Sequence, residues 1–253
     1  MSEFHKAIQR FFESDLCVFP IFYLIGKSRL LNFRFCKFAI NSTALYLEEL
    51  IKSLENHQTE LPGLAAQLRL SPPYRQQYDL EEVKKTNPRI AAVLILLYEN
   101  EEGDIEFPVT LRHSYQGVHS NQFSLPGGSF EPEDINLEYT ALRETVEELG
   151  VDEENIEIVK QLTELYIPPS NFIVYPFVGV HHGVPEFHPD ENEVAEIIPL
   201  DLQAFMVAKP VTFERMFSEY KVDIPGYELG EESYIWGATA MILSEFGALV
   251  EKL

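Results

Sequence analysis

The stretch that decides the fold runs from Leu125 to Val151 and reads LPGGSFEPEDINLEYTALRETVEELGV. Two glycines open a turn near its start, and an acidic loop follows them. The next segment has the composition of a helix, carries Arg143 and three glutamates, and stops at Gly150, where a left-handed residue is expected to end a helix. The sequence therefore predicts a tight turn, a polar loop and one helix in direct succession.

The three glutamates of this helix share one face, because Glu144, Glu147 and Glu148 stand at positions i, i+3 and i+4. At about 100° per residue, the apolar residues fall on the opposite face, namely Leu142, Val146 and Leu149. We expect the apolar stripe to anchor the helix to a sheet while the carboxylates converge on one point. Converging like charges repel unless a cation offsets them, and carboxylate oxygens suit Mg²⁺ or Mn²⁺.

Arg143 stands four residues before Glu147, so the two side chains can pair and fix the orientation of the carboxylate. A solvated acidic helix face is the plainer interpretation of Glu147 and Glu148 alone, and it is common in acidic proteins. The whole string argues against that interpretation, because about eight specified positions, each at roughly 5–10% background usage, rarely match by chance. The stretch therefore indicates a metal-binding site.

Residues 127–151 resemble the signature of the Nudix hydrolases, metal-dependent enzymes that cleave diphosphates joined to other groups. The match is carried by an Arg-Glu pair, a Glu-Glu pair and a glycine, at Arg143, Glu144, Glu147, Glu148 and Gly150. The chain departs from the usual pattern in three ways. The spacing from the glycines to the arginine is one residue longer, Asp134 stands where Glu is usual, and Thr145 replaces an aliphatic residue.

The longer spacing is itself similar to the coenzyme A diphosphatase branch of that family. LYIPPSNFIVYPFVG and IWGATAMIL resemble the body of the same branch, particularly its bacterial members. GGSFEPED and TALRE stand in the register of that branch, with Glu131 in place of its first Asp. The upstream stretch TLRHSYQGVHSNQFSLPGG resembles a second motif of the branch, at Thr110, Arg112, His119, Gln122, Pro126, Gly127 and Gly128. It departs at Gly117 and Asn121, where the branch usually has Arg and Gly. The resemblance covers roughly residues 61–249.

The resemblance implies an α/β protein, a Nudix-type α/β/α sandwich with a mixed sheet and a catalytic loop-helix. It also implies Mg²⁺- or Mn²⁺-dependent hydrolysis of coenzyme A or its thioesters, giving 3′,5′-ADP and 4′-phosphopantetheine or its acyl form. The residues expected to act in catalysis are Glu144, Glu147 and Arg143. The expected metal ligands are Glu144, Glu148 and Glu147. The expected substrate contacts are Arg112, His119, Gly127, Gly128 and Tyr166.

The sequence leaves alternatives open for the general base and for the role of Asp134. The general base is Glu147, Glu144 or a distant carboxylate, Glu191 or Glu193. Asp134 is a candidate for an outer metal contact or for a helix cap.

For each basic or aromatic candidate for substrate binding, a purely structural role is the alternative. Arg112 either contacts a phosphate or pairs with a neighbouring carboxylate, and His119 is either a substrate contact or a structural loop residue. Tyr166, together with Pro168, Pro169 and Phe172, either shapes a substrate pocket or packs in a turn. Three further histidines, His181, His182 and His188, are expected in a solvated loop rather than at a zinc ion.

Apolar periodicity predicts the other elements. Helices are expected over residues 45–54 and 234–250. The second helix places five residues on one face: Ile235, Thr239, Ile242, Phe246 and Leu249. Strands are expected over residues 89–98, 107–111, 156–165, 173–180 and 194–199. Strands with interspersed helices are typical of an α/β layered domain.

The formal net charge of −22, from 19 basic and 41 acidic residues, argues against a nucleic-acid partner, because phosphate backbones need a Lys/Arg footprint. The chain has two cysteines, so we expect a reducing compartment, the cytoplasm, rather than a disulfide framework. No apolar run reaches the ~18–20 residues needed to cross a bilayer. An acidic protein can meet an anionic diphosphate through metal ions, so the expected partner is a small molecule.

The first 45 residues differ from the rest. They carry a net charge of +3 and both cysteines, against −25 for the remainder. Their apolar run over residues 16–26 is only 11 residues long, which is short for a transmembrane helix. They form a membrane-surface or targeting appendage, an extra helical element, or an upstream extension outside the working protein, and we favour the last. The expected domains are residues 1–45, unassigned, and 46–253, a Nudix hydrolase domain.

Two rival functions fit the same sequence. The same chemistry could act on another nucleoside diphosphate derivative, such as ADP-ribose or a dinucleotide, as the departures at Gly117 and Asn121 suggest. Alternatively, the domain could be a non-catalytic module that senses a nucleotide, although a dead site has no reason to keep three mutually repelling carboxylates. A homodimer is left open as an alternative to a monomer.

Overall fold

The computed structural model describes residues 46–56, 60–76, 78–112, 122–217, 220–230 and 233–253. All of them belong to one compact unit, Ala44–Leu253. The N-terminal extension predicted over residues 1–45, with its apolar run, lies outside the described residues.

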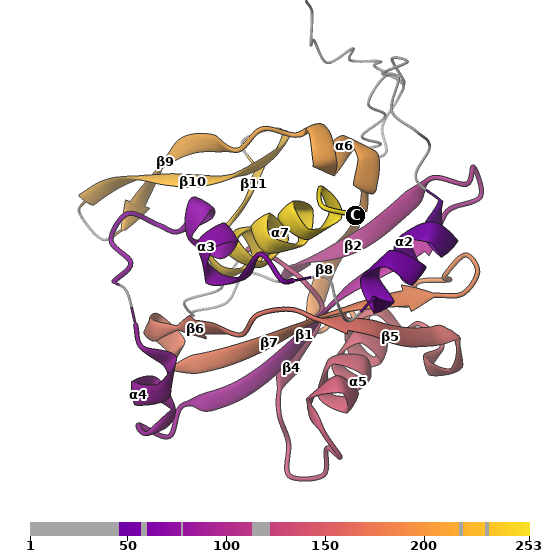
Figure 1. Cartoon of the computed structure of the whole chain (residues 1–253), viewed down its shortest axis with the longest axis horizontal. Helices are drawn as coiled ribbons and strands as arrows, with labels where there is room; N and C mark the ends of the chain where they lie inside the picture. Colours follow the sequence, from indigo (N-terminus) through magenta and orange to yellow (C-terminus); the bar gives the residue numbers. More distant parts are fainter. Residues whose placement is uncertain (1–45, 57–59, 77, 113–121, 218–219, 231–232) are drawn as a thin grey trace, which may run out of the picture. The chain divides into compact units, whose positions relative to one another are not determined.

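A mixed sheet forms the centre of this unit (Figure 1). Its two longest strands, β1 (Arg89–Glu99) and β7 (Phe172–His181), pair in parallel with Leu94 opposite Phe177. Both are nearly continuous apolar runs, as expected for strands that are covered on both faces. The other strands of this sheet pair antiparallel to β1, β2 or β7: β2 (Ile105–Arg112), β3 (Phe123–Ser124), β4 (Gly127–Ser129), β5 (Ile156–Gln161), β6 (Leu165–Ile167) and β8 (Val194–Asp201).

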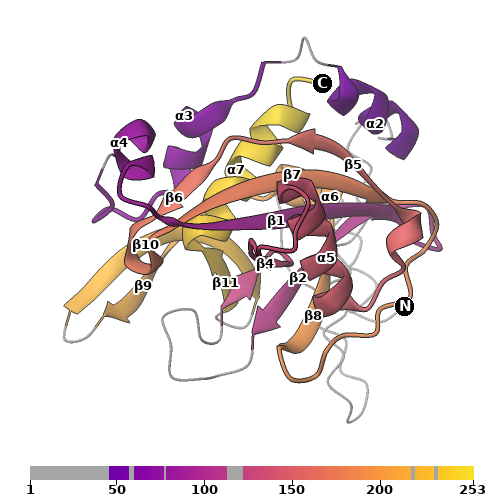
Figure 2. The same cartoon turned by 90° about the horizontal axis from the view of Figure 1, so that it is seen from below.

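One face of the sheet is covered by α5 (Leu137–Leu149), which lies along β1 and β7 (Figures 1 and 2). Its fully buried Ala141 and Leu149 pack against a cluster that contains Leu94 and Phe177. Burial of each large apolar side chain contributes about 1.5–3 kcal/mol. The helix that carries the signature residues is therefore held to the sheet by its apolar side.

The opposite face carries α7 (Gly237–Val250), α2 (Leu47–Glu55) and α3 (Gly63–Gln67), which together cover the larger core (Figure 1). Phe246 of α7 has no exposed surface and meets the ring of Phe107 edge-on. The structure confirms the expected α/β/α sandwich with a mixed sheet. None of the helices in the described part of the chain is long and apolar enough to cross a membrane.

A second, three-stranded antiparallel sheet was not predicted. It consists of β9 (Val211–Phe217), β10 (Tyr220–Gly230) and β11 (Ser233–Trp236), and it flanks α7 (Figure 1). Half-buried and exposed residues alternate along β9, and the adjacent Glu214 and Arg215 interrupt its apolar residues. Phe213 stacks on Tyr234 across this sheet with ring centroids 4.0 Å apart. Such cross-strand pairs stabilise a sheet but leave no contiguous apolar run in the sequence.

Two predicted elements are built differently in the structure. The last helix begins at Gly237 rather than Tyr234, because residues 233–236 form β11 and Gly237 turns the chain with a φ of 65°. Ile235, which was expected on the helix, is instead buried in that strand. The strand predicted over residues 156–165 divides into β5 and β6, because residues 162–164 leave the sheet between them.

The short elements complete the fold. They are η1 (Leu68–Leu70), α4 (Leu80–Lys84), η2 (Glu153–Asn155), η3 (Pro168–Ser170) and α6 (Leu202–Val207). Asp79 caps α4 by accepting from the N–H of Glu81, and Asp201 caps α6 by accepting from the N–H of Ala204. These caps fix where the chain enters each short helix.

Candidate active site

The signature helix α5 begins and ends with local capping signals. The side chain of Asn136 accepts a hydrogen bond from the N–H of Tyr139 at 2.8 Å. Gly150 adopts the left-handed conformation with a φ of 65°, as predicted, and its N–H donates to the carbonyl of Val146. A Cβ at this position would overlap the carbonyl of His188. Both the positive φ and the nearby carbonyl of His188 therefore favour glycine at the end of this helix.

The Gly127–Gly128 turn is built into the sheet as β4. Gly128 lies opposite Ala92, and Gly127 opposite Val93. A Cβ on Gly128 would overlap the carboxylate of Glu144. The absence of a side chain at Gly128 therefore lets a carboxylate of α5 come against the backbone of the sheet.

Arg143 is the centre of the ionic network around α5. Its Nε donates to Oδ1 of Asp134 at 2.8 Å, and its Nη2 donates to Oδ2 of the same carboxylate at 3.1 Å. The guanidinium also lies 3.0 Å from Glu147 and 3.1 Å from Glu144, and it donates to the carbonyl of Ser129. The predicted pairing of Arg143 with Glu147 is confirmed. The planar guanidinium can hold all of these acceptors at once because it has five N–H donors.

Asp134 lies beneath this network with a side chain that is 1% exposed. Its Oδ2 also accepts from the hydroxyl of Thr140 and from the N–H of Glu131, each at 2.9 Å. The hydrogen bonds from Arg143, assisted by those from Glu131 and Thr140, lower the pKa of Asp134 to about 2. The alternative that Asp134 caps the helix is wrong, because Asn136 is the cap. Asp134 instead anchors Arg143.

The depressed pKa of Asp134 predicts a pH-dependent contribution to stability. The ordinary pKa of 3.8 is lowered on folding, so the ionised form stabilises the protein fully above about pH 4. This contribution is lost as the pH falls toward about 2. We expect the difference in unfolding free energy between the wild type and Asp134→Asn, measured by urea titration, to shrink across that range.

Asp223→Asn provides the matched control for this pH series, because Asp223 is exposed on β10. A gap between the wild type and Asp134→Asn that stays constant from pH 5 to pH 2 would contradict the assignment.

The three signature glutamates of α5 have separate environments. Glu148 is 2% exposed and its Oε2 accepts from the N–H of Gly127 at 3.2 Å. The side chain of Glu144 is 15% exposed, and burial raises its pKa while Arg143 opposes that rise. The side chain of Glu147 is 59% exposed beside Arg143. The three carboxylates therefore differ in exposure, and the described residues contain no group of three His, Cys, Asp or Glu that could hold a metal.

The predicted division of α5 into an apolar and a carboxylate face is wrong in part. Its buried positions are Thr140, Ala141, Thr145, Glu148 and Leu149. Leu142 and Val146 are only half-buried, whereas Glu148 points inward with the apolar residues. The hydroxyl of Thr145 donates to the carbonyl of Ala141, which explains how a polar residue is buried where the family usually has an aliphatic one.

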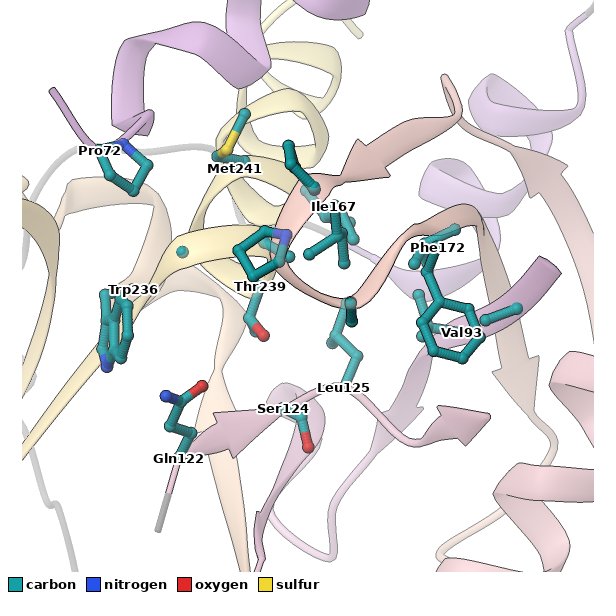
Figure 3. A pocket seen from close by; sticks show the side chains of 18 of the residues that line it. Pro72, Val93, Gln122, Ser124, Leu125, Ile167, Phe172, Trp236, Thr239 and Met241 are labelled. Atoms are coloured by element: carbon teal, nitrogen blue, oxygen red, sulfur yellow. The ribbon is translucent and has the colours of Figure 1, made fainter. Parts of the chain in front are cut away.

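A cavity of about 690 Å³ adjoins the turn, and both Gly127 and Gly128 line it. Figure 3 shows Trp236 at one side of this cavity and Phe172 and Val93 at the other. The volume lies in the range of small-molecule binding sites. Because Gly128 also adjoins the carboxylate of Glu144, the carboxylates and the cavity share a wall.

Only some of the predicted pocket residues line the cavity. Pro168, Pro169 and Phe172 line the cavity, but Tyr166 is not among the described residues that line it. Its hydroxyl donates to Oδ1 of Asn171 at 3.0 Å and its ring meets Tyr78 edge-on. Tyr166, the middle residue of β6, therefore packs against Tyr78 and Asn171.

For two of the predicted substrate-contact residues, the position of the side chain is not described. The backbone of Arg112 ends β2 opposite Val194, but its side chain and the whole of His119 lie outside the described part of the structure. Among the general-base candidates, Glu191 and Glu193 are exposed. Glu193 is near enough for its charge to raise the pKa of Glu144.

The three later histidines do not share one solvated loop. His181 is 4% exposed at the end of β7, and its Nδ1 lies 2.9 Å from the carbonyl of Gly183. His182 is exposed and pairs with Glu157 at 3.0 Å. The expectation of a solvated loop is therefore wrong for His181.

Sequence reasoning missed the cavity residues contributed by segments without a motif. Arg75 comes from the approach to the sheet, and Arg215 and Trp236 come from the unpredicted second sheet. The guanidinium of Arg215 lies 4.6 Å from the centre of the Trp236 ring. An arginine and a tryptophan about twenty positions apart carry no periodic signal, so only the pairing of β9 with β10 and of β10 with β11 brings them together.

The comparisons with known proteins agree on one family. The family model described as the NUDIX domain matches residues 88–215. Nudix hydrolase 15, mitochondrial, from Arabidopsis thaliana is 35% identical over 162 residues, which are 62% of this chain and 56% of that protein. Nudix hydrolase 22, chloroplastic, from the same plant is 30% identical over 235 residues, which are 89% of this chain and 74% of that protein.

Bacterial proteins are similar as well. The protein named Uncharacterized Nudix hydrolase NudL from Pectobacterium atrosepticum is 35% identical over 141 residues, which are 54% of this chain and 71% of that protein. A crystal structure of a MutT/nudix family protein from Enterococcus faecalis aligns with a TM-score of 0.45 at 18% identity, over 82% of this chain and 75% of that one. The match to Nudix hydrolase 15 spans little more than half of the length of that relative.

Proposed function

The chain belongs to the Nudix hydrolases, and from that premise we propose that it hydrolyses the diphosphate bond of coenzyme A or of an acyl derivative. The products are 3′,5′-ADP and 4′-phosphopantetheine or its acyl form. One observation carries the hydrolytic part of the proposal: Gly128 touches the carboxylate of Glu144 and also lines the 690 Å³ cavity. The choice of coenzyme A rests on the resemblance of GGSFEPED, TALRE and residues 110–128 to one branch of the family.

Nudix hydrolases generally use divalent metal ions such as Mg²⁺ or Mn²⁺. The residues of this chain fit such an ion by their chemistry. Glu144 and Glu148 offer hard carboxylate oxygens beside a turn where Gly128 leaves space that a Cβ would fill. We propose these two glutamates as ligands. A bound ion polarises a phosphoryl oxygen and lowers the pKa of an attacking water.

The protein's own groups orient this site. Asp134 holds Arg143, and Arg143 in turn holds Glu144 and Glu147. We propose Glu147 as the general base, because its side chain is 59% exposed and therefore accessible to water. Arg143 is then a positioning residue. Glu193 is the competing base, because its charge acts on Glu144.

The substrate-binding part of the proposal includes residues at the cavity and at the end of β2. Gly127 and Gly128 would let a phosphate approach the backbone closely. Arg112 and His119 keep their proposed substrate contacts on the strength of the motif alone, and Tyr166 keeps its role only as a support for Tyr78 at the cavity edge.

A panel of substrates tests the proposal. With Mg²⁺ or Mn²⁺, we expect kcat/KM for coenzyme A to exceed that for ADP-ribose and for a dinucleotide by about tenfold or more, because the chain resembles the coenzyme A branch. Chromatography that detects 3′,5′-ADP and 4′-phosphopantetheine is the measurement. A preference for ADP-ribose would overturn the substrate, and turnover of none of the three would favour the nucleotide-sensing module.

We further propose that residues 46–253 form the hydrolase domain and that residues 1–45 lie outside the catalytic machinery. The proposed partner is a small molecule rather than a nucleic acid or a membrane, and the cytoplasm is the proposed compartment because the chain has only two cysteines. The two plant relatives carry mitochondrial and chloroplastic in their names. We also propose a homodimer, which a measurement of molecular mass in solution would test.

A further inference from the structure

The charge of the cavity is opposite to that of the chain. The protein has 41 acidic and 19 basic residues, yet among the described residues that line the cavity there is no Asp or Glu and there are two arginines, Arg75 and Arg215. The rest of the lining is apolar, aromatic or neutral. A cavity of this composition favours an anionic ligand, because its charged groups are guanidinium donors.

The two arginines differ in what they already bind. Nη2 of Arg75 donates to the carbonyl of Tyr166 at 2.7 Å, so this side chain helps to hold the cavity wall. The guanidinium carbon Cζ of Arg215 instead lies over the ring of Trp236, 4.6 Å from the ring centroid. Within the described part of the chain, no carboxylate lies at ion-pair distance from Arg215. A ring contact uses the face of a guanidinium and leaves the in-plane N–H groups to an oxyanion.

Aromatic contacts hold Arg215 in place. Trp236 meets Phe217 edge-on with ring centroids 6.1 Å apart, and Phe217 meets Tyr74 edge-on at 5.6 Å. These three rings line the cavity together with Arg215. A cation that is already positioned by packing loses little side-chain entropy when it binds a phosphate.

We propose that this cavity takes the nucleotide half of the substrate and that Arg215 binds a phosphate monoester on its ribose. The inference rests on the proposed function and deepens it, because coenzyme A carries a 3′-phosphate in addition to its diphosphate. The apolar and aromatic walls accommodate the base and ribose, and the guanidinium donates two hydrogen bonds to the phosphate dianion. The rival occupant, the pantetheine or acyl arm, carries no anionic group to pair with Arg215. Arg215 is therefore a specificity-determining residue that distinguishes substrates with and without the 3′-phosphate.

The first test compares coenzyme A with 3′-dephospho-coenzyme A in the wild type and in Arg215→Met. We expect the wild type to favour coenzyme A by about tenfold or more in kcat/KM, mainly through KM. Arg215→Met should lose that preference while its kcat/KM on the dephospho substrate stays within about twofold. Arg69→Met is the matched control, because Arg69 is exposed and outside this cavity. Equal losses on both substrates, or no loss on either, would overturn the inference.

A second test separates this inference from the hydrolytic proposal. Calorimetric titration without metal should show that 3′,5′-ADP binds about tenfold more tightly than 5′-AMP, and that Arg215→Met abolishes the difference. This result would support the phosphate site even if coenzyme A were not hydrolysed. Equal binding of the two nucleotides to the wild type would overturn the phosphate site even if coenzyme A were hydrolysed.

Discussion

Replacing Glu148 with Gln is expected to lower kcat on coenzyme A by about 100-fold or more while leaving the protein folded. Glu148 is 2% exposed beside the Gly127–Gly128 turn, where its Oε2 accepts from the N–H of Gly127. Glutamine has the same shape and keeps an oxygen for that hydrogen bond. It removes the negative charge that the proposed metal ion requires. Steady-state kinetics with coenzyme A over a range of Mg²⁺ concentrations is the measurement.

The matched control for this change is Glu138→Gln. Glu138 belongs to the same helix but is exposed in its first turn, away from the turn that lines the cavity. We expect this control to keep wild-type turnover. Thermal unfolding shows whether Glu148→Gln is folded, and Mn²⁺ titration reports the loss of affinity directly. Wild-type turnover by a folded Glu148→Gln protein would refute the ligand assignment.

Replacing Glu245 with Leu is expected to lower the free energy of unfolding by about 3 kcal/mol. Glu245 is a fully buried residue of α7 that accepts hydrogen bonds from four donors on three residues of two other segments. The donors are the N–H of Gly63, Nε2 of Gln67, and the N–H and hydroxyl of Thr163, at 2.6–3.3 Å. Leucine leaves these donors unpaired in the core, at a cost of about 1–3 kcal/mol for each buried donor that water does not reach.

The measurement for Glu245 is urea or thermal unfolding, with a fall of about 6–12 °C in the transition midpoint. Glu186→Leu is the matched control, because the side chain of Glu186 is 91% exposed and its loss should change stability by less than about 0.5 kcal/mol. Glu245→Gln separates the loss of hydrogen bonds from a change in side-chain volume. The amide presents one acceptor oxygen and one donating NH₂ group to neighbours that all donate. We expect a smaller loss than for leucine. A Glu245→Leu protein as stable as the control would contradict a role in docking α3 on α7.

The local structure around the signature follows from the sequence. Gly150 ends α5 as predicted, the strand over residues 89–98 corresponds to β1, and the pairing of Arg143 with Glu147 is in place. Each of these features depends on residues within one helical turn or one strand. Periodicity and capping chemistry act over that range, so a single sequence is enough to predict them.

The environment of each carboxylate was decided by the tertiary structure. Glu148 is buried and Glu147 is exposed, although both were assigned to one face. The difference arises because the N–H of Gly127, 21 residues away in sequence, meets Glu148. Asp134 likewise became an anchor for Arg143 rather than a cap, because the loop folds back on the helix. Helical spacing predicts which residues are neighbours on a helix, but not which side the sheet covers.

The composition of the cavity also required the fold. Arg215 and Trp236 meet through the pairing of β9, β10 and β11, whose alternating pattern did not stand out in the sequence. Glu245 meets Gly63 across 182 positions. The sequence by itself determined the family, the turn and the helix, because those signals are local in the chain. Only the tertiary structure decided which charges are buried, paired or facing the cavity, because burial and pairing depend on residues that are distant in sequence and adjacent in space.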